Sequence, residues 1–152
     1  MTAPIPFFDG HNDFLLRLLM TPAPREETWL GTAGHGHLDL ARMKDAGFAG
    51  GLFAIFVPPA SGGPPPDFKA LMAAPPYALP MPPEMTHPQA QPIALAMAGL
   101  LHWMERAAPD DFRVCRSVAE IRAAMAQGVI AGMMHMEGAE AIGPDLDALY
   151  LF

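Results

Sequence analysis

The sequence predicts an α/β fold with a parallel sheet, the N-terminal part of a (β/α)8 TIM-type barrel. Residues 48–57 and 129–136 are nearly continuous apolar runs, which are typical of strands covered on both faces. Each run follows directly on a segment with helical periodicity, as expected for strands joined by helical crossovers. With a short apolar run near the N-terminus, these segments indicate about three strand–helix units. A complete barrel takes roughly 250 residues, so we expect the 152-residue chain to be truncated or one piece of a larger fold.

The composition is that of one folded domain over residues 1–152. Hydrophobic residues make up 51% and charged residues 16%, which suffices for a core and argues against a disordered chain. The net charge is −7 without any basic cluster, so nucleic acid is not expected as a partner. The single cysteine, Cys115, excludes an internal disulfide framework and a thiolate metal cluster. Because neither a signal peptide nor a membrane span is recognisable, we expect a cytoplasmic protein with no membrane partner.

The first third of the chain alternates strand and helix. We expect a brief buried strand over residues 5–8, a helix over 14–20, a loop over 25–37, a helix over 38–47 and a strand over 48–57. Asn12 or Asp13 is placed to cap the first helix. Gly47 ends the second helix and leads straight into the apolar strand, a junction typical of α/β folds.

A proline-rich stretch interrupts this alternation. Residues 58–92 hold twelve of the 18 prolines, so no long regular element is expected there. We interpret this stretch as an extended surface insertion within the single domain. Pro92 suits the first turn of a helix that runs to about Ala107.

The last third repeats the α/β pattern. We expect a short strand over residues 112–115, a helix over 118–127, a strand over 129–136 and a helix over 146–152. Ser117 with Glu120 three residues later predicts a capping box, and Gly128 ends that helix. The final helix has no capping residue after it, which supports the expectation of truncation.

Three residues with metal-ligating side chains follow the predicted strands. His11 and Asp13 are two positions apart, and alternate residues of an extended segment point the same way. Glu137 follows a later strand, and barrel enzymes keep their chemistry at the carboxyl ends of their strands. Imidazole nitrogen and carboxylate oxygen are suitable zinc ligands, and a glutamate can hold two metals. The alternatives are a helix N-cap beside a surface histidine and, for Glu137, a solvated strand end.

Two motifs resemble the membrane (renal) dipeptidase family of zinc peptidases. Residues 8–13, with the sequence FDGHND, resemble the family's DGHND opening, and residues 135–139, HMEGA, resemble its strand ending in Glu-Gly. The similarity extends through residues 38–51 and 117–126 and so spans nearly the whole chain. It is weakest in the proline-rich stretch.

The resemblance implies a metallodipeptidase that hydrolyses dipeptides with a metal-activated water. It implies that His11 and Asp13 bind one zinc and that Glu137 bridges two. In the intact family two further histidines complete the second zinc site, and other catalytic residues also lie on later strands. The chain has no histidine after Glu137, so we expect at most one zinc here and assign no catalytic residue. His135 and Asp9 are candidates for contacts that support the ligands.

Three other readings stay open at this point. The first alternative is an inactive fragment, and the second is an association module that forms a homodimer through an open sheet edge. The third is another metal-dependent amidohydrolase. Amidohydrolases more often open with His-x-His, so Asp13 at the second position favours the dipeptidase. The remaining histidines, His35, His37, His87 and His102, are interpreted as surface or packing residues.

Overall fold

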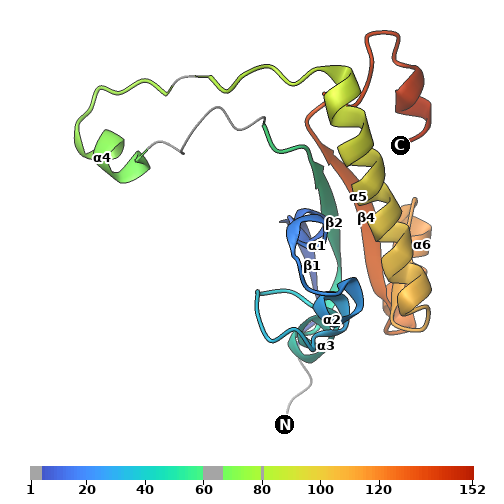
Figure 1. Cartoon of the computed structure of the whole chain (residues 1–152). Helices are drawn as coiled ribbons and strands as arrows, with labels where there is room; N and C mark the ends of the chain where they lie inside the picture. The colour runs from blue at the N-terminus through green and yellow to red at the C-terminus, as the bar shows by residue number, and fades with distance from the viewer. Residues whose placement is uncertain (1–4, 60–66, 80) are drawn as a thin grey trace.

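The computed structural model describes residues 5–59, 67–79 and 81–152. The strands are β1 (Phe7–Asn12), β2 (Phe48–Phe56), β3 (Phe112–Val114) and β4 (Ile130–Glu137). The helices are α1 (Phe14–Met20), α2 (Arg25–Leu30), α3 (Leu40–Ala46), α4 (Phe68–Ala73), α5 (His87–Ala107) and α6 (Val118–Ala126), followed by the 3-10 turn η1 (Asp147–Tyr150). All strand pairs are parallel, and the sheet order is β1-β2-β4-β3 (Figure 1). The predicted α/β fold with a parallel sheet is therefore confirmed.

The main core lies between the sheet and the helices α1 and α5. Its centre is a group of fully buried aromatic rings, in which the Phe112 ring lies 5.3 Å from the rings of both Trp29 and Phe53. Gly132 of β4 permits this packing, because a Cβ there would come within 2.3 Å of the Phe112 ring. A short β3 at the edge thus contributes the ring that joins β2, β4 and α2.

Strand β1 differs from its predicted form. It runs on through Asn12, and Phe7 and Phe8 are 45% and 40% exposed rather than buried. The reason is the place of β1 at the edge of the described sheet, where only β2 pairs with it. The DGHN motif consequently belongs to the strand itself.

The helices near the N-terminus confirm two predictions and correct one. Helices α1 and α3 are present, and Gly47 ends α3 in a left-handed conformation with φ of 79°. At α1 the N-cap position is Asp13, yet the side-chain cap comes from Asn12, whose Oδ1 accepts the N–H of Phe14 at 3.3 Å. The predicted loop over residues 25–37 is wrong at its start, because residues 25–30 form α2 and bury Trp29.

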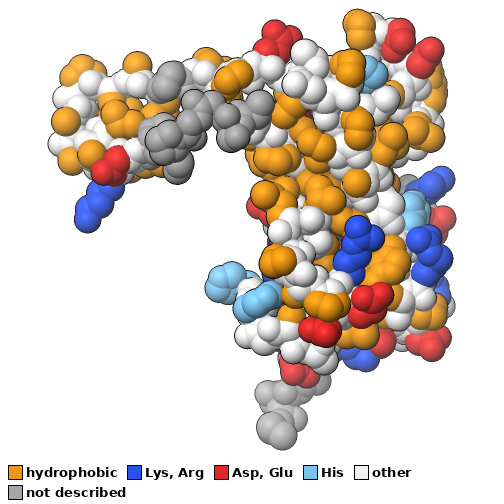
Figure 2. All heavy atoms as spheres, in the orientation of Figure 1, with side chains coloured by type: hydrophobic (Ala, Val, Ile, Leu, Met, Phe, Trp, Pro, Cys, Tyr) orange, Lys and Arg blue, Asp and Glu red, His pale blue; other side chains and the backbone are white. Residues whose placement is uncertain are grey.

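Of the proline-rich stretch, residues 67–79 lie apart from the sheet and residues 81–86 lead into α5 (Figure 1). Helix α4 lies on this stretch and has no buried residue. Hydrophobic side chains are exposed on this segment and along α5 (Figure 2). Residues 60–66 and 80 of the predicted insertion lie outside the described residues. Across the rest of the chain, no helix has the length and apolarity needed to cross a membrane.

Helix α5 begins five residues before its predicted start. Its first residue is His87, and Pro92 lies inside the helix rather than in its first turn. Gln89 accepts the backbone N–H of Thr86 at 3.0 Å, and Pro88 occupies the first turn that we assigned to Pro92. The physical reason is that a proline in the first turn loses no helical hydrogen bond, and Pro88 meets this condition earlier.

In the C-terminal part the predicted cap by Ser117 is confirmed, whereas the predicted capping box and the predicted last helix are wrong. Ser117 caps α6 by accepting the N–H of Glu120 at 3.2 Å, although Glu120 itself bonds to the N–H of Arg116 instead of closing a capping box. The predicted helix over residues 146–152 is only the turn η1. Tyr150 is 92% exposed, so a longer helix there would gain little from burial.

Candidate metal centre

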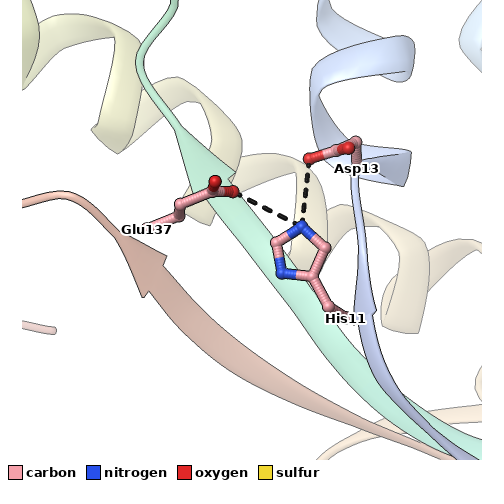
Figure 3. A group of neighbouring side chains, drawn as sticks. All are labelled: His11, Asp13 and Glu137. Atoms are coloured by element: carbon pink, nitrogen blue, oxygen red, sulfur yellow. Dashed lines mark ion pairs between the residues drawn. The ribbon is translucent and has the colours of Figure 1, made fainter.

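The carboxyl ends of β1 and β4 bring three predicted ligands together. His11 lies near the end of β1, Asp13 follows that strand at once, and Glu137 is the last residue of β4. Figure 3 shows the imidazole of His11 directed at both carboxylates, with β2 passing between the two contributing strands. Residues separated by more than 120 positions in sequence thus meet at one edge of the sheet.

Strand alternation places Glu137 on the face of the sheet that the main core does not use. Met134 and Met136 of β4 pack against that core, so His135 and Glu137 point to the opposite face. On the middle strand, Ala54 pairs with His135. A small side chain at Ala54 leaves room for groups from β1 and β4 to approach one another across β2.

The separations within the cluster suit a shared cation. The Nε2 of His11 lies 3.4 Å from Oδ1 of Asp13 and 3.4 Å from Oε2 of Glu137. A charge-assisted hydrogen bond would be shorter, at about 2.7–2.9 Å. Two ligand atoms bound tetrahedrally to one zinc, each about 2.1 Å from the ion, lie about 3.4 Å apart. All three ligand atoms are within 4.8 Å of one another, a spacing at which the group could hold a metal ion.

The cluster is accessible from solvent. The side chains of His11, Asp13 and Glu137 are 41%, 60% and 44% exposed. A cation held by these three side chains would keep open positions for water or substrate, as catalytic zinc sites do.

Two further residues lie where the sequence placed candidates for support of the ligands. The ring of His135 meets that of His11 edge-to-face, with centroids 5.4 Å apart. Asp9 accepts the backbone N–H of His11 through Oδ1 at 3.3 Å. Asp9 also accepts the side-chain amide of Asn12 at 3.0 Å; the sequence predicted Asn12 as a possible helix cap but not as a partner of Asp9. Nothing in the sequence pattern indicates that Asn12 pairs with Asp9, because the bulge that brings the two side chains together is set by the pairing of β1 with β2.

Other histidines do not join the cluster. Among the described residues, His11, Asp13 and Glu137 form the one group of three or more potential ligands with suitable spacing. His87 instead lies with Nε2 3.1 Å from the carbonyl oxygen of Ala141, and the carbonyl of His35 accepts a hydrogen bond from Arg17. These contacts tie α5 to the loop after β4 and α1 to the loop after α2, and the described residues contain a single candidate metal site.

A cavity of about 700 Å³ opens at the same end of the sheet. Its lining includes Phe56, the register partner of Glu137, and residues that follow β4 such as Glu140 and Ile142. The wall is completed by residues of the proline-rich stretch and the start of α5. A small ligand has room to lie beside the end of β4.

Comparison with known sequences identifies one family over the whole chain. The membrane dipeptidase family, peptidase family M19, matches residues 1–152. A protein of Acinetobacter calcoaceticus, described as "Uncharacterized protein in PQQ-III 3'region", is 36% identical over 149 residues. The aligned part covers 97% of this chain and 45% of that relative.

Solved structures show the same relation. A metallopeptidase from Rhodobacter sphaeroides, liganded with a phosphinate mimic of the dipeptide L-Ala-D-Ala, is 62% identical with a TM-score of 0.88. A structure described as "the dipeptidase AC", a metallopeptidase of family M19, is 63% identical with a TM-score of 0.86. Each match covers 99% of this chain but only 43% and 42% of the other. The chain therefore spans less than half the length of these relatives, and its sheet corresponds to part of a dipeptidase fold, as the sequence predicted.

Proposed function

We propose, since the chain belongs to the membrane dipeptidase family (peptidase family M19), that it carries a metal site of a dipeptide-hydrolysing enzyme. The ligands are His11, Asp13 and Glu137, and the metal is zinc. The observation that carries this proposal is the convergence of their three ligand atoms within 4.8 Å at the carboxyl edge of a parallel sheet. Chemically, one imidazole and two carboxylates suit zinc, which prefers nitrogen, sulfur and carboxylate ligands.

Each residue has a distinct task in this proposal. His11 supplies the neutral nitrogen donor through Nε2, and Asp13 and Glu137 supply negative charge on either side of it. When bound, zinc supplies Lewis acidity and lowers the pKa of a water molecule toward about 7. His135, in contact with the His11 ring, and Asp9, bound to its backbone, limit how the imidazole is oriented. By resemblance, Glu137 is also the residue that faces a second zinc.

The proposed substrate class is the dipeptide, including dipeptides with an L residue followed by a D residue. Support comes from the Rhodobacter sphaeroides relative, which was solved with a mimic of L-Ala-D-Ala. The cavity of about 700 Å³ that Phe56 lines at the same end of the sheet offers space for a molecule of that size, although none of the three ligands lines it. Because the chain spans less than half of such relatives, complete turnover is proposed for a protein with the full family length.

Metal content tests the site directly. The purified chain is loaded with zinc, freed of excess metal and analysed by atomic emission, alongside His11→Ala and Glu137→Gln. His37→Ala is the matched control, because this histidine is exposed and lies outside the cluster. We expect about one bound zinc in the wild type and the control and a loss in both ligand variants. Equal zinc in all four proteins would reject the site.

Release of free D-Ala from L-Ala-D-Ala tests the activity. The measurement is made on the 152-residue chain and on a chain extended to the family's full length. We expect turnover in the extended protein and its loss in His11→Ala. Zinc binding without turnover in the shorter chain would favour the inactive fragment for this chain and would leave the metal site standing. No dipeptide cleavage by the extended, zinc-loaded protein would reject the dipeptidase.

A further inference from the structure

A β-bulge interrupts β1 within the ligand motif. Asp9 pairs with Gly51 and Asn12 pairs with Phe53, so β1 advances three residues while β2 advances two. Such an extra residue changes which face the following side chains take, and bulges often re-aim side chains beside active sites. In a regular strand Asp9 and Asn12 would point to opposite faces. Across the bulge both lie on the face of Gly51 and Phe53, and a Cβ at Gly51 would come within 3.1 Å of that of Asp9.

Two hydrogen bonds lie across this bulge, and a third follows it. Asp9 accepts the backbone N–H of His11 through Oδ1 at 3.3 Å and the side-chain amide of Asn12 through Oδ2 at 3.0 Å. Asn12 in turn accepts the N–H of Phe14 through Oδ1 at 3.3 Å. The bonds therefore fix the backbone on both sides of the two proposed ligands, at His11 itself and directly after Asp13.

Asn12 is the buried member of this arrangement. Its side chain is 7% exposed and lies on the face that packs against α1 and α5, whereas His11 and Asp13 are exposed. A buried amide without partners is costly, and here both its donor and its acceptor are used. Since neither ligand side chain is held rigidly by burial, their direction depends on the backbone that Asn12 and Asp9 hold.

We propose that Asn12, hydrogen-bonded to Asp9 across the bulge, is a positioning residue that aims His11 and Asp13 at the metal. This inference rests on the proposed metal site and adds a residue that the ligand motif itself does not explain. Asp9 holds the strand side of the motif and Asn12 the helix side. Groups that orient metal ligands in this way are commonly worth about 10–100-fold in metal affinity.

An exchange of the two side chains tests the proposal. In Asn12→Asp the carboxylates of residues 9 and 12 face each other and repel. In Asp9→Asn a single carbonyl oxygen remains to accept both the backbone N–H of His11 and the side-chain amide of Asn12. The double variant Asp9→Asn/Asn12→Asp again pairs one amide with one carboxylate, with the net charge of the wild type. It can form all three hydrogen bonds with the roles of the partners reversed.

Titration with Co²⁺ provides the readout, because its visible absorption reports both affinity and ligand geometry. Thermal unfolding of the metal-free proteins is measured in parallel, with Ser117→Ala as a control that weakens a remote helix cap. We expect each single exchange to raise the Co²⁺ dissociation constant about tenfold or more and to change the absorption bands. The double exchange should restore both, and Ser117→Ala should alter unfolding alone.

The outcomes separate this proposal from the metal site on which it rests. Normal Co²⁺ affinity and bands in the single variants would overturn the positioning role while the site stands. A double variant that folds as well as the wild type but binds as poorly as the single variants would overturn it too. Absence of Co²⁺ binding in the wild type would reject the site and the positioning role together.

Discussion

The middle of the sheet and its carboxyl end use the same strands in opposite ways. In the middle of β2, Phe53 and Ile55 are 0% and 1% exposed and belong to the apolar core. At the carboxyl end, the side chains of His11 and Glu137 are 41% and 44% exposed and face polar groups. Stability and ligand binding therefore lie in separate layers, and a substitution in one layer should leave the other largely unchanged.

The largest expected effect belongs to the core layer. Phe112→Ala removes a ring that packs on Trp29 and Phe53, and truncation of a buried phenylalanine costs about 3–5 kcal/mol. We expect this loss in the free energy of unfolding measured with urea. Phe112→Leu, which keeps most of the apolar volume, should lose less. A free energy unchanged by Phe112→Ala would contradict the central place of this ring.

The two layers meet at Ala54. This residue is 0% exposed, lies on the middle strand and shares the face of its partner His135. Ala54→Leu should cost about 1–3 kcal/mol from overpacking and should also weaken zinc binding, because the new side chain enters the space between β1 and β4. Urea unfolding and chelator competition measure the two effects.

Ala54→Gly is the matched control for this position. It should lower the free energy of unfolding by about 0.5–1 kcal/mol, as glycine does in a strand, while zinc binding is kept. Unchanged zinc affinity in Ala54→Leu would show that the ligands do not approach one another over Ala54.

The ligand cluster was predictable because it depends on simple periodicities. His11 and Asp13 are two apart at the end of a predicted strand, and the carboxyl ends of parallel strands share one edge. Those rules placed both residues with Glu137 before any pairing was known. They did not reveal the bond between Asp9 and Asn12, because two side chains three apart share a face only across the bulge that pairing with β2 creates.

The errors in the predicted elements have local physical causes. Helix α2 is six residues long, too short for helical periodicity to stand out, although Pro24 before it and Gly31 after it mark its limits. Pro92 predicts too late a start for α5, because the Thr86–Gln89 capping pair that begins the helix is hidden within the proline-rich stretch. Strand β3 lies beyond β4, where the Phe112 ring packs over Gly132. This is a tertiary contact, and no local sequence pattern predicts it.

A smaller effect is expected at the start of α6. Ser117→Ala removes the oxygen that accepts the N–H of Glu120, and loss of such a cap costs about 1 kcal/mol. Urea unfolding should show this loss, while zinc content stays at the wild-type level because the cap lies away from the ligands. Ser117→Asp, which also caps helices, should recover most of the stability. Loss of zinc in Ser117→Ala would show that the two layers are coupled.

The smallest expected effect is a pH dependence set by Cys115. Burial, and then the nearby Glu120 carboxylate, raises the pKa of this thiol above its ordinary value of 9.0. The folded chain thus holds the proton more tightly than the unfolded chain, so the stabilisation is complete below about pH 9 and is lost as the pH rises through the folded pKa. Unfolding of the wild type and of Cys115→Ala in reducing buffer from pH 7.5 to 10 isolates this contribution. The wild type's advantage over the variant should shrink at the alkaline end, and a difference independent of pH would show that the thiol ionises as easily in the core as in water.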